Sequence, residues 1–418
     1  MWDDLTPDVW RDDLVELTDT VEREHVDPWH AVSATAFRQS ARSLRIRLPR
    51  LTGHEVIVEL ARLVALIGDG HTALRLPDVA EFGRFPIRLD RFSDGVFVRA
   101  IAPEHAALGG GQVIAIGDVP ILEAWDLARS LVSRDNEMGI WAQVPDLLVI
   151  PEVLHALGLV PTTDRATFTV ERPDGERRSI VLAPIATHDP DLLDARLRLR
   201  MADPLWLRRP GENWFEHLPG IDSLYMAYNT VRDHAPEPLS TFFGRALDLV
   251  ATEGIDRFVL DIRRNGGGDM ALNWPLVDGL IRSDAVNRWG HLFVIIGRGT
   301  FSAAMNLAVD LEQRTRVLFV GEPTGARPNQ FGENADIVLS HSGLRATASA
   351  LFWQNSLPYD DREWIEPDIP ARLSSADYLR QRDPAFEAIL SYQPGGDSGD
   401  DDPPGRLARK LGGPPLAP

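Results

Sequence analysis

The spacing of apolar residues predicts three helices in the first part of the chain. Within each helix the apolar positions recur every three or four residues, as on one buried face. These faces consist of Trp10, Leu14, Leu17 and Val21, of Phe37, Ala41, Leu44 and Leu48, and of Ile57, Leu60, Val64 and Ile67. The first helix begins at Thr6-Pro7, and the third opens with the capping box Thr52-x-x-Glu55 and ends at Gly68. Residues 1–78 are therefore predicted to form an N-terminal helical domain that carries His71.

The next stretch, residues 79–190, has the short apolar runs of a β-rich region. The predicted elements are strands at 96–98 and 113–116, helices over 121–132 and 147–159, and a hairpin of 167–171 and 179–182. The hairpin strands flank Arg172-Pro173-Asp174-Gly175, whose residue types favour a tight turn. A small β-rich domain is expected here.

The third region, residues 205–392, alternates strands with helices. Its predicted elements are strands at 223–229, 258–262, 292–296 and 316–320 and helices over 239–252 and 303–312. The strands are short apolar runs, typical of a parallel sheet that is buried on both faces. A helix between two such strands indicates a parallel crossover, so an α/β fold is predicted. The polar stretch 184–211 precedes this domain, and the Gly-, Pro- and Asp-rich tail, residues 393–418, is expected to be disordered.

The composition of the chain excludes several kinds of binding partner and chemistry. The chain has 418 residues, a net charge of −19 and no cysteine, so nucleic acid and anionic membranes are not expected partners and no thiol can act as a nucleophile. The N-terminus lacks the features of a secretory signal and no apolar run reaches the ~20 residues of a membrane span, so a cytoplasmic protein is expected. The 11 histidines lack metal-ligand spacing and no nucleotide-binding loop is present, so no metal or organic cofactor is expected.

Two turns carry the candidate chemistry. The strand at 258–262 leads into Gly266-Gly267-Gly268, a run whose backbone can present amide N–H groups to a ligand. The strand at 292–296 leads into Ser302, which falls where the chain turns sharply from a strand into a helix. A serine at such a turn is exposed at the sheet edge, and the amide of Ala303 points forward at the positive end of the helix. An N-cap role for Ser302 is the alternative, but the glycine loop favours catalysis because it could supply a second oxyanion donor.

Four motifs follow one another in a fixed order along the chain. They are Gly68-Asp69-Gly70-His71-Thr72, Asp-Ile-Arg-Arg-Asn-Gly-Gly-Gly at 261–268, Gly-Thr-Phe-Ser-Ala-Ala at 299–304 and Gly-Glu-Pro-Thr-Gly at 321–325. Together they resemble the catalytic core of the tail-specific (C-terminal-processing) serine proteases and the tricorn core protease, and the resemblance covers most of residues 1–392. It implies a crotonase-like or Clp-like α/β catalytic core, an N-terminal helical bundle and a small β-rich, PDZ-like insert.

The resemblance also bears on the general base. The usual tail-specific proteases place a lysine shortly after the Gly-Glu-x-Thr turn, but that position holds Arg327, and the one lysine is Lys410 in the tail. Arginine stays protonated and cannot act as a base, although it could bind a carboxylate such as a substrate C-terminus. His71 matches the histidine of the tricorn-like branch and is the expected base, with a structural turn histidine as the alternative. Gly70 replaces the serine that precedes the histidine in that branch, so the orienting network must differ.

A carboxylate near the terminal Pro-Asp-Ile segment helps to orient the histidine in the tricorn-like branch. Asp361 matches best by position, with Asp360 and Glu366 as alternatives, and a solvated acidic loop is the competing interpretation. In the PDZ-like region, which in this family grips substrate C-termini by strand addition, the glycine run 109–111 is either a carboxylate loop or a flexible turn.

The sequence therefore predicts a serine peptidase that acts on peptide or protein substrates. Ser302 would attack the scissile carbonyl, His71 would accept its proton, and the amides of Ala303 and Gly267 would hold the oxyanion. The family includes relatives that bind ligands without catalysis, so a catalytically silent ligand- or peptide-binding protein is the alternative. Acyl-CoA chemistry of the crotonase type is a third option, which the acidic composition disfavours. Relatives often assemble, so a homo-oligomer is a further expectation.

Overall fold

The computed structural model describes residues 2–186, 191–199, 202–208, 211–393 and 410–411. The chain divides into two compact units. Unit 1 comprises residues 1–202, 331–353 and 374–381, and unit 2 comprises residues 203–330, 354–373 and 382–418. Residues 394–409 and 412–418 of the tail predicted to be disordered lie outside the described residues.

Unit 1 begins with the three predicted helices, which the structure confirms as α1 (Pro7–Glu24), α2 (Ala34–Arg47) and α3 (Gly53–Ala65). Side-chain caps satisfy amide groups at their first turns, where the backbone has no intrahelical partner. Thr6 accepts a hydrogen bond from the amide of Val9, and Thr52 and Glu55 form the predicted capping box. The apolar faces pack together in the core of unit 1.

The β-rich part of unit 1 is a sheet with its main strands in the order β2-β3-β4-β6-β7, to which β5 (Val119–Pro120) and β8 (Leu193–Asp194) add short pairings. These strands are β2 (Ile87–Phe92), β3 (Gly95–Ile101), β4 (Gln112–Ile116), β6 (Ala166–Glu171) and β7 (Arg177–Leu182). The predicted hairpin is confirmed as β6 and β7, which are paired antiparallel. Its turn ends at Gly175, whose φ of 83° suits glycine.

The helices of this region follow the prediction less closely. The predicted helix 121–132 is α4 (Ile121–Ala128) followed by a short 3₁₀ turn. The predicted helix 147–159 is wrong in extent, because the structure has α5 (Glu137–Leu147) and then α6 (Pro151–Ala156). A residue that precedes proline disfavours helical geometry, and Ile150 before Pro151 is extended, with φ −99° and ψ 115°.

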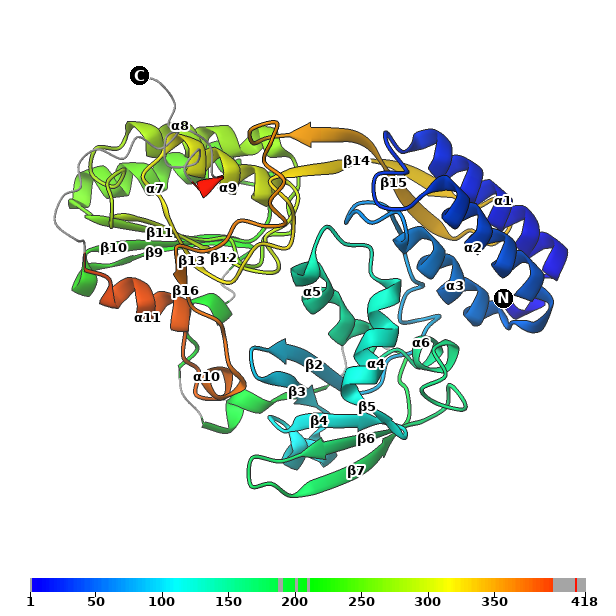
Figure 1. Ribbon diagram of the computed structural model, residues 1–418. Helices are drawn as coiled ribbons and strands as arrows, with labels where there is room; N and C mark the ends of the chain where they lie inside the picture. The colour runs from blue at the N-terminus through cyan, green and yellow to red at the C-terminus, as the bar shows by residue number, and fades with distance from the viewer. Residues whose placement is uncertain (1, 187–190, 200–201, 209–210, 394–409, 412–418) are drawn as a thin grey trace. The chain divides into compact units, whose positions relative to one another are not determined.

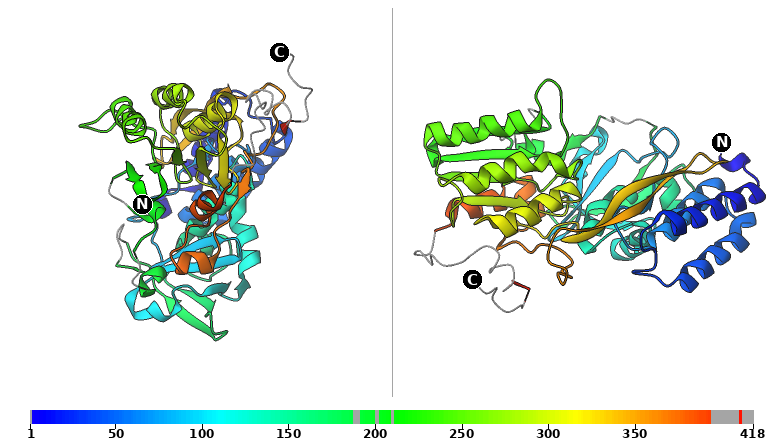
Figure 2. Two further views of the ribbon diagram at one scale, coloured as in Figure 1. Left: turned by 90° about the vertical axis from the view of Figure 1, so that its left-hand side faces the viewer. Right: turned by 90° about the horizontal axis from the view of Figure 1, so that it is seen from above.

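A long hairpin of β14 (Asn329–Val338) and β15 (Arg345–Gln354) was not predicted. Residues 331–353 of this hairpin belong to unit 1 and lie beside the N-terminal helices (Figure 2). At the hairpin tip, the carboxylates of α1 accept hydrogen bonds from backbone amides, Glu16 from Ser340 and Asp13 from Ser342. On its other side, β15 pairs with β1 (Ala73–Leu74), a short strand that begins two residues after His71.

Unit 2 contains a sheet of six strands in the order β16-β13-β12-β11-β10-β9. The strands are β9 (Asn213–Leu218), β10 (Ser223–Tyr228), β11 (Arg257–Asp261), β12 (Leu292–Ile296), β13 (Leu318–Gly321) and β16 (Ile369–Pro370). All neighbouring pairs are parallel except β9 with β10. Three helices connect the parallel strands in turn: α7 (Leu239–Glu253), α8 (Trp274–Arg282) and α9 (Ala303–Arg314). The predicted parallel α/β arrangement is therefore confirmed.

Both faces of this sheet are covered, which explains its apolar strands. Alternate residues of β11 point to opposite faces, so Phe258 packs with the cluster formed by α7, α8 and α9, and Val259 packs with that of α11 (Pro384–Ser391). Figure 1 shows α7, α8 and α9 on one face of the sheet and α11 on the other. Because β11 and β12 are parallel neighbours, their carboxyl ends bring the glycine loop and the serine turn to one edge. None of the helices in the described part of the chain is both long and apolar enough to cross a membrane.

Candidate active site

Ser302 lies in a strained turn between β12 and α9. Its backbone has φ 54° and ψ −127°, a region that costs a side-chain-bearing residue about 1–3 kcal/mol. The turn before it is fixed by Thr300, whose hydroxyl accepts from the amide of Gly297 at 3.1 Å and donates to the carbonyl of Ile262 at 2.9 Å. Ser302 occupies the N-cap position of α9, yet its side chain makes no capping hydrogen bond. Ser302 is half-buried, and its hydroxyl is not used to cap the helix.

The glycine loop lies directly against this serine. A Cβ placed on Gly267 would fall 2.6 Å from Cβ of Ser302 and 2.8 Å from the amide nitrogen of Ala303, so only glycine fits there. Gly267 also has φ 99°, which glycine adopts readily. Its amide donates to Oδ1 of Asn265 at 2.9 Å, whereas the amide of Ala303 has no acceptor among the described residues. The structure thus brings Ser302, Ala303 and Gly267 together.

Two residues of the same motif hold the loop in shape. Asn265 donates from Nδ2 to the carbonyl of Tyr228 at 2.9 Å, and its own carbonyl accepts from the amide of Phe301 at 3.0 Å. Asp261 is buried and accepts from the hydroxyl of Tyr225 at 2.5 Å and from Nε of Arg263 at 3.0 Å. These contacts tie the loop to β10 and to the serine turn, a structural role that explains both residues.

A cluster of side-chain amides behind the serine was missed by the sequence interpretation. Gln330 is 3% exposed, and its Nε2 donates to the backbone carbonyl of Ser302 at 3.2 Å and to Oδ1 of Asn306 at 2.8 Å. Asn355 donates to the same Oδ1 at 2.8 Å. The cluster holds the carbonyl of the strained residue. Its members are 24 to 49 positions apart in the chain, so no local pattern could have revealed it.

His71 lies in unit 1, in a turn held by one buried carboxylate. Oδ1 of Asp69 accepts from the amide of His71 at 2.9 Å and from the amide of Thr72 at 2.8 Å. The carbonyl of His71 accepts from Thr347 of β15 at 2.7 Å, which fixes the far side of the turn. Gly70, which stands where the tricorn-like branch has a serine, donates its amide to Asp135 at 2.7 Å.

The electrostatic setting of His71 favours a neutral imidazole. Burial lowers the pKa of His71 below its ordinary value of 6.5, while the charge of Asp69 and a hydrogen bond to the Phe331 backbone act in the opposite direction. Burial by itself would raise the pKa of Asp69, but hydrogen bonds from His25, Ser349 and Thr72 bring that pKa down to about 2. Asp69 is therefore ionised and His71 is unprotonated at neutral pH, the state that a general base needs.

The three candidate carboxylates lie in unit 2 and differ in their surroundings. Asp360 is buried and engaged, since it accepts from Ser356 at 2.5 Å and from Arg362 at 2.8 Å. Glu366 accepts from the indole of Trp364 at 2.6 Å. Asp361 is exposed, and the structure shows no hydrogen bond or ion pair for it within the described residues.

The two basic residues discussed for the site also lie in unit 2. The side chain of Arg327 is 41% exposed, and its NH2 group lies 3.9 Å from the carboxylate of Glu363. Lys410 lies 3.0 Å from Asp368 and 3.4 Å from Glu312, so the one lysine of the chain is used in ion pairs.

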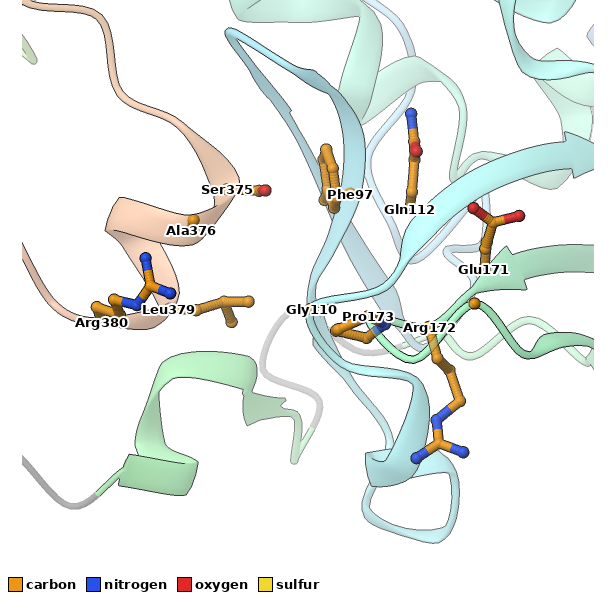
Figure 3. A pocket seen from close by; sticks show the side chains of 11 residues that line it. Phe97, Gly110, Gln112, Glu171, Arg172, Pro173, Ser375, Ala376, Leu379 and Arg380 are labelled. Atoms are coloured by element: carbon orange, nitrogen blue, oxygen red, sulfur yellow. The ribbon is translucent and has the colours of Figure 1, made fainter.

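Unit 1 also contains a cavity of ≈ 400 Å³ between the β-rich sheet and α10 (Ser375–Leu379). Figure 3 shows Phe97 and Gln112 on the sheet side and Leu379 on the helix side. Leu379 lies 2.8 Å from where a Cβ of Gly110 would be, and the amides of all three glycines at 109–111 donate to carbonyls of their own region. The glycine run is therefore a packed structural turn, and the interpretation as a carboxylate loop has no free amide to support it.

No group of three or more potential metal-binding side chains is placed to hold an ion in the described parts of the chain. The residues gathered around Ser302 are hydroxyl, amide and glycine groups, which suit acyl chemistry at a carbonyl.

Comparison with known proteins shows the fold. No protein-family model and no curated protein sequence matches the chain. Among solved structures, a mutant of CPAF superposes with a TM-score of 0.63 at 12% identity, covering 93% of this chain and 99% of that chain. Mature CPAF complexed with lactacystin gives a TM-score of 0.61 at 12% identity, covering 91% and 97%. The photosystem II D1 C-terminal processing protease gives 0.42 at 16% identity, covering 94% and 98%.

The chain thus has the mixed α/β fold of CPAF. The resemblance to tail-specific and tricorn-like proteases, which the four motifs carry, is confirmed at the level of the fold.

Proposed function

We propose that this chain is a serine peptidase that hydrolyses peptide bonds in peptide or protein substrates. The observation that carries the proposal is the Ser302 turn. A serine held at φ 54° between a buried strand and a helix carries conformational strain, and its hydroxyl is not used as a helix cap. Strain of this kind is found at nucleophiles, where the turn exposes the hydroxyl and the next amide faces the reacting carbonyl.

In the proposed reaction, Oγ of Ser302 attacks the scissile carbonyl while His71 accepts the hydroxyl proton. The amides of Ala303 and Gly267 hold the resulting oxyanion, for which the Gly267 amide must exchange its present acceptor, Oδ1 of Asn265, for the oxyanion. His71 then donates its proton to the leaving amine, so the peptide C–N bond breaks and an acyl-serine ester remains. Water, deprotonated by His71, hydrolyses that ester and restores the serine.

His71 is assigned as the base because the chain offers few alternatives. Arginine at position 327 cannot accept a proton, and Lys410 is held in ion pairs. We assign Asp361 to orienting the histidine, because Asp360 and Glu366 already have partners. Arg327 would bind a substrate carboxylate.

We also propose which parts of the fold correspond to the catalytic core, the helical bundle and the PDZ-like insert. Unit 2 would be the crotonase- or Clp-like catalytic core, the helices α1 to α3 the N-terminal bundle, and the β2–β7 sheet the PDZ-like insert. The proposed domains follow the predicted limits of 1–78, 79–190 and 205–392, except that residues 331–353 and 374–381 belong to unit 1.

The test is labelling with a fluorophosphonate probe, which reacts with activated serines, followed by peptide hydrolysis. The wild-type chain is compared with Ser302→Ala and His71→Ala, and Ser283→Ala and His105→Ala serve as controls from outside the site. We expect stoichiometric labelling of the wild type and both controls and none in the two site variants. Labelling that survives Ser302→Ala refutes the nucleophile, and labelling that survives His71→Ala refutes the base. A folded wild-type chain that never labels between pH 6 and pH 9 refutes the peptidase and leaves the silent binding protein.

A further inference from the structure

Behind the His71 turn lies a buried histidine–aspartate pair that the proposed reaction does not use. Asp69 is 1% exposed, and its Oδ2 lies 3.0 Å from Nε2 of His25, whose side chain is fully buried. Its other oxygen, Oδ1, accepts from the backbone amides of His71 and Thr72 and from the hydroxyl of Ser349 at 2.8 Å. One carboxylate therefore collects four donors, two of which are the backbone of the turn that carries His71.

The tautomer of His25 follows from its second contact. The amide of Asp27 donates to Nδ1 of His25 at 2.9 Å, so Nδ1 holds a lone pair and the ring proton is on Nε2. His25 is thus a hydrogen-bond donor to Asp69 through Nε2. Its ring is fixed by packing, since it stacks on His30 with centroids 5.7 Å apart and contacts Phe331 at 5.2 Å.

We propose that His25 is a positioning residue for His71, acting through the hydrogen bond from its Nε2 to the Asp69 carboxylate that fixes the backbone of the His71 turn. This inference rests on the proposed function, because the positioned group is the proposed base. A carboxylate with free rotation could release either amide of the turn. The hydrogen bond to the rigid His25 ring fixes Oδ2 of Asp69, so Oδ1 is held in the direction of the two amides of the turn.

The ionised state of Asp69 adds an electrostatic reason for this arrangement. The hydrogen bond from His25 stabilises the charged form of the carboxylate and so helps to keep Asp69 ionised. That charge acts on His71 against the effect of burial, and so keeps the imidazole basic enough to accept a proton.

The test uses two substitutions of His25 by amide residues, each of which keeps only one of its two hydrogen bonds. In His25→Gln, the longer side chain places an amide N–H near the position of Nε2, so the donor to Asp69 is kept. In His25→Asn, the shorter side chain keeps an acceptor near the position of Nδ1 but cannot reach Asp69. His105→Gln, at a histidine of unit 1 outside the Asp69 network, is the control. Each variant is measured for the rate of fluorophosphonate labelling, for kcat and KM, and for the ¹H–¹⁵N shifts of the amides of His71 and Thr72.

We expect His25→Asn to lower kcat and the labelling rate about 10- to 100-fold with little change in KM, as for lost orienting partners elsewhere. His25→Gln and His105→Gln should stay close to the wild type. The downfield amide shifts of His71 and Thr72 should persist in His25→Gln and be lost in His25→Asn. Equal losses in the two His25 variants, or a wild-type rate in folded His25→Asn, would overturn the proposal.

Two further results are decisive. If His25→Asn fails to fold, Ser349→Ala removes another donor to Asp69 and should show the same losses at smaller size, and wild-type behaviour there would overturn the role of the carboxylate. The amide shifts do not need an active serine. A wild-type chain that never labels therefore refutes the proposed function, while the shift pattern alone still decides whether His25 fixes the turn.

Discussion

Replacement of Gly267 by alanine is the sharpest test of the serine site. The new Cβ would lie 2.6 Å from Cβ of Ser302, 2.8 Å from the amide nitrogen of Ala303 and 3.0 Å from the carbonyl oxygen of Phe301. Non-bonded carbon atoms prefer separations of about 3.5–4.0 Å, so the loop and the serine turn must move apart by about 1 Å. The three atoms belong to the backbone or to Cβ, so no flexible side chain can absorb the change.

The expected loss of activity can be estimated in two independent ways. A misplacement of about 1 Å in a catalytic site costs about 10²-fold, and loss of one oxyanion donor costs about 10²–10³-fold in kcat. We therefore expect Gly267→Ala to lower the labelling rate and kcat/KM by about 100- to 1,000-fold. The positive φ of 99° at this position adds a loss of stability of about 1–2 kcal/mol.

Gly266→Ala supplies the matched control. A Cβ on Gly266 meets no atom within 4 Å, and the residue is exposed. This variant should label within about threefold of the wild type, as expected for a surface substitution. Urea unfolding of both variants shows that the native state is populated in the assay. A folded Gly267→Ala chain that labels at the wild-type rate would refute the glycine-loop oxyanion hole, and an equal loss in Gly266→Ala would refute the geometric argument.

Four further predictions concern strain, charge and capping. Ser302→Gly should be about 1 kcal/mol more stable than Ser302→Ala in urea unfolding, because glycine accepts φ 54° without strain. Asp69→Asn should cost about 2 kcal/mol at pH 7, since the pKa of Asp69 falls from 3.8 to about 2 on folding, and that stabilisation is lost as the pH falls from 3.8 through about 2. The kcat/KM profile of the wild type should fall only below pH 6.5, where His71 becomes protonated, and Asp69→Asn should move this limb to lower pH because the charge that raises the pKa is gone. Thr52→Ala should cost about 1 kcal/mol in urea unfolding, through loss of the capping box.

The parts of the fold that were predicted correctly are those with a local cause. The α3 helix has its capping box and its apolar period within one stretch, and β12 is a continuous apolar run whose predicted limits are those observed. The parts that were missed have misleading local patterns. Pro145 lies inside α5, where proline usually signals a helix end, and β14 carries exposed polar residues because only part of it is buried. These elements are stabilised by tertiary packing that a sequence window does not contain.

The same distinction applies to the candidate site. The glycine loop and the serine turn were predictable because the residue types that each backbone conformation requires are adjacent in the sequence. The structure places Gly267 against Ser302. The residues that hold the site in place come from distant parts of the sequence. Gln330 reaches the Ser302 carbonyl across 28 positions, and His25 reaches Asp69 across 44. A histidine far from any motif resembles a surface residue until folding buries it beside a carboxylate. Sequence can therefore nominate the reacting groups, whereas the residues that hold them in place become visible only in the folded chain.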